Sequence, residues 1–193
     1  CYTTQAVFPI YFVMRVSHEP STAGPWKFQP KLQGVESAWS PDDGTYKLYE
    51  NYHREIAGDD IGYRFSYDDL GEGEQVTVHM GVSFVSIENA RMNLEAEQQG
   101  KTFDQLRAEA TAQWNRDLGR IRIEGGTPDQ QTIFYTALYH ALIHPSIISD
   151  VNGENPKMES GDTGKADYTR YSVFSLWDTY RNLHPLLTLV YPE

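Results

Sequence analysis

The chain has 193 residues, with 16 Lys and Arg against 27 Asp and Glu, so its formal net charge is −11. This acidic balance argues against a nucleic-acid binder, because phosphate contacts need clustered basic side chains. No apolar run approaches the roughly 18 residues that a membrane-spanning helix needs. The single cysteine, Cys1, excludes an internal disulfide and a cysteine-based metal site.

The first half of the chain has the pattern of strands and turns. Strands are predicted within 5–17 (interrupted at Pro9), 46–52, 61–67 and 75–87. The stretch 20–30 is rich in Pro, Gly and Ser and is predicted to be a loop. Several strands joined by polar turns favour an antiparallel β-sandwich.

The stretch 75–87 has the clearest strand pattern. Its alternate apolar residues are expected to face a core, and they are Val76, Val78, Met80, Val82 and Phe84. The apolar phase then shifts to Val85 and Ile87, which predicts a bulge.

From Asn89 onward the period becomes helical. Two capping boxes, Thr102–Gln105 and Thr127–Gln130, predict two helix starts. Apolar spacing extends the first helix to Gly119 and the second to just before Pro145. After a long, polar, Gly-rich connection over 145–171, a last helix is predicted from Ser175, which Pro185 would break or kink.

Most of the remaining polar motifs are better explained by local structure than by chemistry. The acidic doublets at 42–43, 59–60 and 68–69 are typical of turns. The run that begins at Asp150 lacks the EF-hand spacing of Gly and Glu, so a tight turn at Asn152-Gly153 is predicted instead. His140 and His144 have two-histidine metal spacing without the metalloprotease Glu, and a helix-end role is favoured for His144.

One cluster, residues 171–181, combines an indole, a carboxylate, a phenol and a guanidinium. Trp177 and Asp178 together match a sugar ring, because the aromatic plane covers its C–H face and the carboxylate accepts from vicinal hydroxyls. A buried Trp177 in a helix interface, with an Asp178–Arg181 pair, explains the same residues equally well. Both interpretations stay open on chemistry alone.

Four motifs in fixed order resemble glycoside hydrolase family 92, the calcium-dependent exo-acting α-mannosidases. They are Phe134–His140 with His144-Pro145, then Ser149–Gly153, then Phe174–Arg181, and finally His184–Leu187. The resemblance covers 75–193 well and 1–74 loosely. Because both ends of the chain look cut, we expect it to be part of a longer polypeptide.

The resemblance implies a fold that agrees with the change of period. An antiparallel, supersandwich-like β-sandwich would be followed by a helical linker and the first helices of an (α/α)6 toroid. The expected bounds are 1–90 for the end of the sandwich, 91–120 for the linker and 121–193 for the start of the catalytic toroid.

The resemblance also implies an activity, which is removal of terminal α-linked, typically α-1,2, mannose by inverting hydrolysis. The catalytic acid, the base and the ligands of a Ca²⁺ cofactor would lie outside this chain, so no catalytic or metal residue is assigned here. Trp177 and Asp178 carry over as substrate-binding residues, as an apolar wall and a hydroxyl acceptor. Arg181 would orient Asp178 or pack structurally. We expect the 193-residue chain by itself to be inactive.

The implied partners are a mannose-containing glycan and the remainder of the same polypeptide, and the implied location is periplasmic, secreted or at the bacterial cell surface. A non-catalytic carbohydrate-binding or assembly module is the main alternative. A disaccharide phosphorylase would need a phosphate pocket, and the sequence shows no basic cluster that would form one.

Overall fold

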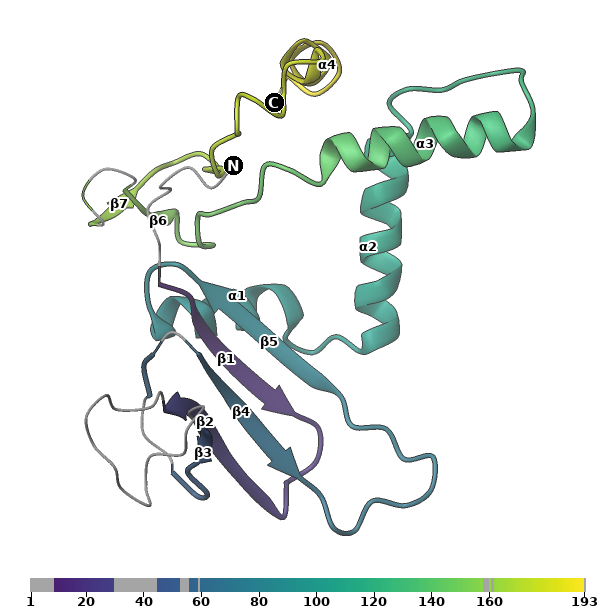
Figure 1. The fold of residues 1–193 in the computed structure, drawn as a ribbon. Helices are drawn as coiled ribbons and strands as arrows, with labels where there is room; N and C mark the ends of the chain where they lie inside the picture. Colours follow the sequence, from purple (N-terminus) through teal and green to yellow (C-terminus); the bar gives the residue numbers. More distant parts are fainter. Residues whose placement is uncertain are drawn as a thin grey trace. The chain divides into compact units, whose positions relative to one another are not determined.

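The computed structural model describes residues 9–29, 45–52, 56–58, 60–157, 160 and 162–192 (Figure 1). The chain divides into two compact units, Val16–Thr77 and Cys1–Arg15 with Val78–Glu193. The described part has antiparallel strand pairs followed by helices, which confirms the predicted order of the two kinds of element. None of its helices is both long and apolar enough to cross a membrane.

The unit Val16–Thr77 is built on a three-stranded antiparallel sheet in the order β3-β2-β4. Its strands are β2 (Thr22–Gln29), β3 (Thr45–Leu48) and β4 (Ile61–Ser66). Strands at β3 and β4 confirm two predictions, whereas the loop predicted at 20–30 is wrong. Pro25 lacks an N–H, but its carbonyl still accepts from the Tyr49 amide at 2.9 Å. Gly24 is required for a steric reason, because a Cβ there would lie 2.2 Å from the Tyr49 carbonyl oxygen.

In the other unit, β1 (Tyr11–Val16) pairs with β5 (Val78–Ser83), and helix α1 (Ile87–Gln98) packs on β5 (Figure 1). Val13, Ala90 and Leu94 form the buried apolar core of this region, with Tyr11 and Ile87 against it. Gly81 permits the close approach of α1, since a Cβ there would lie 2.3 Å from the Ala90 carbonyl oxygen and 2.6 Å from the Leu94 Cβ.

This packing reverses the predicted faces of β5. Gly81 and Ser83 are buried, whereas Val78, Met80 and Val82 are 51%, 51% and 47% exposed. The apolar alternation predicted the strand correctly and its core-facing side wrongly, because a glycine offers the flat surface that the helix needs. The predicted bulge is also wrong: β5 ends at Ser83, and α1 begins at Ile87 with the Ser86 hydroxyl as its cap.

The next two helices, α2 (Phe103–Leu118) and α3 (Pro128–Leu142), begin at the two predicted capping boxes. In both, the threonine hydroxyl accepts from the backbone N–H of the glutamine three residues later, and the side-chain oxygen of that glutamine accepts from the backbone N–H of the threonine. α2 ends at Leu118, before Gly119, as predicted. The Trp114 ring of α2 contacts the Tyr139 ring of α3, with centroids 4.7 Å apart.

Beyond α3, the predicted connection contains a short antiparallel hairpin of β6 (Glu154–Pro156) and β7 (Thr163–Lys165). The helix predicted from Ser175 is wrong: residues 176–182 form turns, and α4 spans Leu183–Val190. Pro185 therefore lies in the first turn of α4, where its missing N–H has no helical partner to lose.

Candidate functional site

A buried carboxylate, Asp150, organises the polar interior of this part of the chain. Its side chain accepts three hydrogen bonds of 2.7 Å each, from the Ser83 hydroxyl of β5 and from the side-chain amides of Asn89 and Asn93 on α1. Asp150 is only 7% exposed, so these charge-assisted bonds replace the water that the carboxylate lost. We call Ser83, Asn89, Asn93 and Asp150 the Asp150 cluster.

The backbone around Asp150 is fixed by the same residues. The Val151 amide donates to Asn93 Oδ1 at 3.0 Å, and the Gly153 amide donates to the Asp150 carbonyl at 2.8 Å. Gly153 has φ +84°, which a left-handed turn position requires and which confirms the predicted tight turn. Asn89 also donates to Glu154 Oε2 at 2.8 Å, and this bond is the main reason that the pKa of Glu154 is lowered.

The sequence reasoning missed this cluster. Asn89 and Asn93 lie one helical turn apart, next to the buried Ala90 and Leu94. Two amides on the apolar side of a helix could have indicated a buried polar partner, because buried polar groups are hydrogen-bonded. The partner, Asp150, lies 57 residues beyond Asn93, so local patterns could not identify it.

From Asp150, two stretches of chain run antiparallel toward the predicted sugar-binding residues. The Ile148 amide donates to the Arg170 carbonyl at 2.9 Å, and the Ser172 amide donates to the Ser146 carbonyl at 2.8 Å. The His144 ring, through Nε2, bonds the Val173 carbonyl at 3.0 Å. These bonds fix the segment that leads into Phe174 and Asp178.

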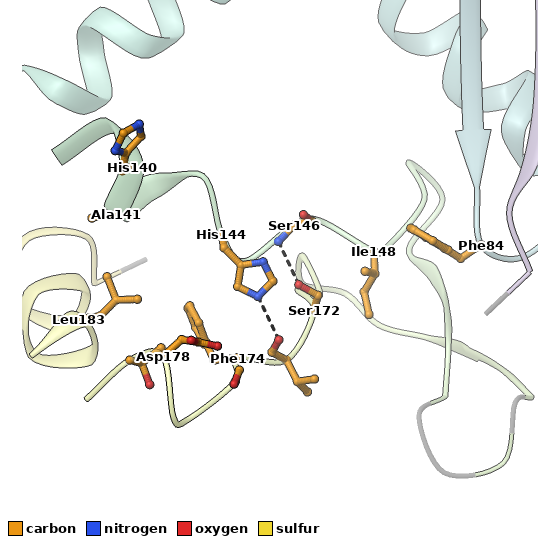
Figure 2. A pocket seen from close by; sticks show the side chains of 13 residues that line it. Phe84, His140, Ala141, His144, Ser146, Ile148, Ser172, Phe174, Asp178 and Leu183 are labelled. Carbon is orange, nitrogen blue, oxygen red and sulfur yellow. Dashed lines mark hydrogen bonds between the residues drawn. The ribbon is translucent and has the colours of Figure 1, made fainter. Parts of the chain in front are cut away.

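A cavity of about 580 Å³ opens where these stretches meet. Figure 2 shows side chains that line it. Phe174 lies edge-to-face between two imidazole rings, with centroids 5.3 Å from His144 and 4.8 Å from His184. His184 Nε2 also lies 3.0 Å from the hydroxyl of the buried Thr179. Asp178 lines the cavity beside this aromatic group, which gives it an apolar wall and one carboxylate.

The two sequence-predicted binding residues are both on the surface. Trp177 is 78% exposed, and Asp178 is exposed as well. Within the described part of the chain, therefore, Trp177 is not packed in a helix interface, and its binding role stays a prediction. Arg181 donates to the Tyr180 hydroxyl at 2.6 Å and lies against the Tyr180 ring, so it binds Tyr180 rather than Asp178.

The described residues hold no group of three or more His, Cys, Asp or Glu side chains that could bind a metal ion. His140 and His144 line the cavity instead, and His144 lies beyond the end of α3.

The comparisons with known proteins agree on one family. The profile of the glycosyl hydrolase family 92 catalytic domain matches residues 89–193. An uncharacterized secreted glycosidase from Arthroderma benhamiae is 34% identical over 112 residues, which make up 56% of this chain and 14% of that protein.

Solved structures extend the similarity to most of the chain. A family 92 α-mannosidase from Bacteroides thetaiotaomicron is 31% identical, with a TM-score of 0.66 over 93% of this chain and 22% of its own. An inverting family 92 mannosidase from the same organism is 27% identical, with a TM-score of 0.69 over 95% of this chain and 22% of its own. The chain thus spans less than a quarter of the length of these relatives. Because the family profile matches more than half of the chain, the chain belongs to glycosyl hydrolase family 92.

Proposed function

We propose that this chain is part of an α-mannosidase that removes terminal α-1,2-linked mannose from mannan or N-glycan. The observation that carries the proposal is family membership over 89–193, together with mannosidases among the solved relatives. One of these relatives was solved in complex with mannoimidazole. The relative described as an inverting mannosidase supports inversion as part of this proposal. An inverting mechanism needs one acid and one base with a water molecule between them.

In this proposal, the cavity beside Asp178 receives the terminal mannose. The Asp178 carboxylate lines the cavity and accepts hydrogen bonds from vicinal hydroxyls. The exposed Trp177 ring, the preceding residue in the sequence but not part of the cavity lining, covers the C–H face of the sugar. Both groups bind and orient the substrate. The acid and the base would come from other parts of the protein, because the chain covers only 22% of the solved relatives.

Calcium assistance is proposed by resemblance to the family. The described residues do not fit a calcium site, since they contain no cluster of three carboxylate or imidazole ligands. A bound calcium ion would polarise sugar hydroxyls, and its ligands would belong to other parts of the protein.

The finer architecture is proposed on the same basis. Residues 1–90 would complete a β-sandwich, 91–120 would link it to the next domain, and 121–193 would begin an (α/α)6 toroid. The protein would act outside the cytoplasm, in the periplasm, at the cell surface or in the medium. The relative described as a secreted glycosidase supports that location.

The test is mannose release from α-1,2-mannobiose by the intact protein and by its Asp178→Ala variant. We expect kcat/KM to fall on the order of 100-fold, because a charged acceptor of sugar hydroxyls is lost. Asp104→Ala, on the exposed side of α2, is the control and should leave kcat/KM unchanged. An unaltered kcat/KM in Asp178→Ala would remove that residue from the substrate site.

The same assay applied to the 193-residue chain alone should show no mannose release, because the acid and base are expected elsewhere. Mannose release by this chain would place the catalytic carboxylates within it. Sugar binding by the intact protein without any hydrolysis would instead favour a non-catalytic carbohydrate-binding module.

A further inference from the structure

A second cavity, of about 620 Å³, lies on the β6–β7 hairpin and is separate from the cavity beside Asp178. Asn155 on β6 pairs with Gly164 on β7, and both residues line it. Its volume is within the range of small-molecule sites, roughly 300–1,000 Å³. We call it the hairpin cavity.

Three basic side chains line the hairpin cavity, although the whole chain has a net charge of −11. They are Lys157, Lys165 and Arg170. None of the three is in a salt bridge of 4.0 Å or less within the described residues, although Lys165 acts on the Glu154 carboxylate at longer range. Among the described residues, Asp167 is the one acidic residue that lines the cavity. The described lining therefore carries a positive charge, which suits an oxyanion.

Asn155 adds an unused acceptor at this cavity. The residue is 1% exposed, and its side-chain amide donates to the Gly153 carbonyl at 3.1 Å, while its Oδ1 has no partner. A Cβ on Gly164 would lie 3.5 Å from this oxygen and 3.3 Å from Lys157 Cγ. The Lys157 stem and Asn155 Oδ1 thus lie against the same side of Gly164. Leaving a buried acceptor without a partner is unfavourable, and a ligand hydroxyl would satisfy it when the flexible lysine moves aside.

We propose that the hairpin cavity binds the phosphate group of a phosphorylated sugar. The lysines and Arg170 hold the phosphate oxygens, with the guanidinium able to form two parallel bonds. Asn155 Oδ1 accepts from a sugar hydroxyl, and the exposed Tyr168 ring offers an apolar face for the sugar. That the phosphate is carried on a sugar rests on the function proposed above, whereas the anion site rests on the cavity alone.

The experiment is calorimetric titration of the intact protein with mannose 6-phosphate, mannose and inorganic phosphate. Mannose 6-phosphate should bind at least tenfold more tightly than either of the other two probes. The double variant Lys157→Gln/Lys165→Gln should weaken its binding at least tenfold, and added salt should weaken binding to the unaltered protein. Both lysines are exposed, so the double variant is expected to keep the melting temperature of the parent.

Arg107→Gln is the matched control, because it removes a positive charge from the exposed side of α2 and should not change binding. Unchanged affinity in the double lysine variant would overturn the site. Equal affinity for inorganic phosphate would overturn the sugar part. Asp178→Ala should retain mannose 6-phosphate binding; if that variant abolishes binding, the ligand occupies the proposed mannose site and the hairpin cavity is rejected.

Discussion

The Asp150 cluster and the segment Ser175–Arg181 use the same chemical groups in opposite ways. In the cluster, a buried carboxylate accepts three side-chain hydrogen bonds. In the segment, Asp178 is exposed and lines a cavity, next to an indole that is 78% exposed. A carboxylate whose acceptor sites are occupied by the protein stabilises a fold, whereas one whose oxygens face a cavity can bind a ligand. The difference between the two aspartates lies in their partners and not in their type.

The sharpest way to test this contrast is to remove each carboxylate in turn. Asp150→Ala leaves a hydroxyl and two amides without their buried acceptor, so we expect the free energy of unfolding to fall by about 3–5 kcal/mol. Asp178→Ala should change it by less than about 0.5 kcal/mol. Urea denaturation measures both. A similar loss in the two variants would show that Asp178 is also structural.

A substitution at Gly81 tests whether the position of α1 maintains the cluster. In Gly81→Ala, the new Cβ would meet the Ala90 carbonyl oxygen and Leu94, so α1 would have to move away from β5 and take Asn89 and Asn93 with it. We expect a loss of about 1–3 kcal/mol in stability. Gly71→Ala is the control, because its Cβ would meet no atom nearer than 3.5 Å. Equal stability of the two variants would contradict this role of Gly81.

The smallest expected effect is a loss of stability at low pH through Glu154, which accepts a hydrogen bond from Asn89 of the Asp150 cluster. Hydrogen bonds from Asn89 and Asn152 lower the pKa of Glu154 below its ordinary value of 4.5. A lowered folded-state pKa contributes stability that is present above pH 4.5 and is lost as the pH falls through the folded value. Melting temperatures between pH 7 and pH 3 should therefore decline less in Glu154→Gln than in the parent chain. An identical decline would show that other groups cause it.

Local chemistry predicted the elements of this fold more reliably than their packing. The capping boxes at Thr102 and Thr127 determined two helix starts, because both partners of each bond lie within four residues. The buried face of β5 could not be predicted, since it depends on how closely α1 approaches Gly81. The prediction of a helix from Ser175 was also wrong: the apolar residues there have helical spacing, but the chain forms turns until Leu183.

The candidate site was predicted in part. Trp177 and Asp178 were chosen for their chemistry and for the family resemblance, and both are accessible to solvent; their binding role stays a prediction. The cavity wall of His144 and Phe174, with His184 packed against Phe174, was not predicted, because these rings come from separate stretches of chain. The sequence shows no basic cluster, because Lys157, Lys165 and Arg170 are separated along the chain and line one cavity only in the folded structure.

The long sequence separations within the Asp150 cluster have a kinetic consequence. Its three side-chain bonds join residues that are 67, 61 and 57 positions apart, and each demands closure of a large loop. Until that closure, the carboxylate remains hydrated and the two asparagines are solvated on a helix that is already capped. Contacts between residues so far apart in the sequence form late and slow the folding reaction. During synthesis, the hydrogen bonds of the Asp150 cluster should therefore form only after the Asn152-Gly153 turn has left the ribosome. During folding, the backbone amides from Val151 to Gly153 should be among the last to gain protection from hydrogen exchange.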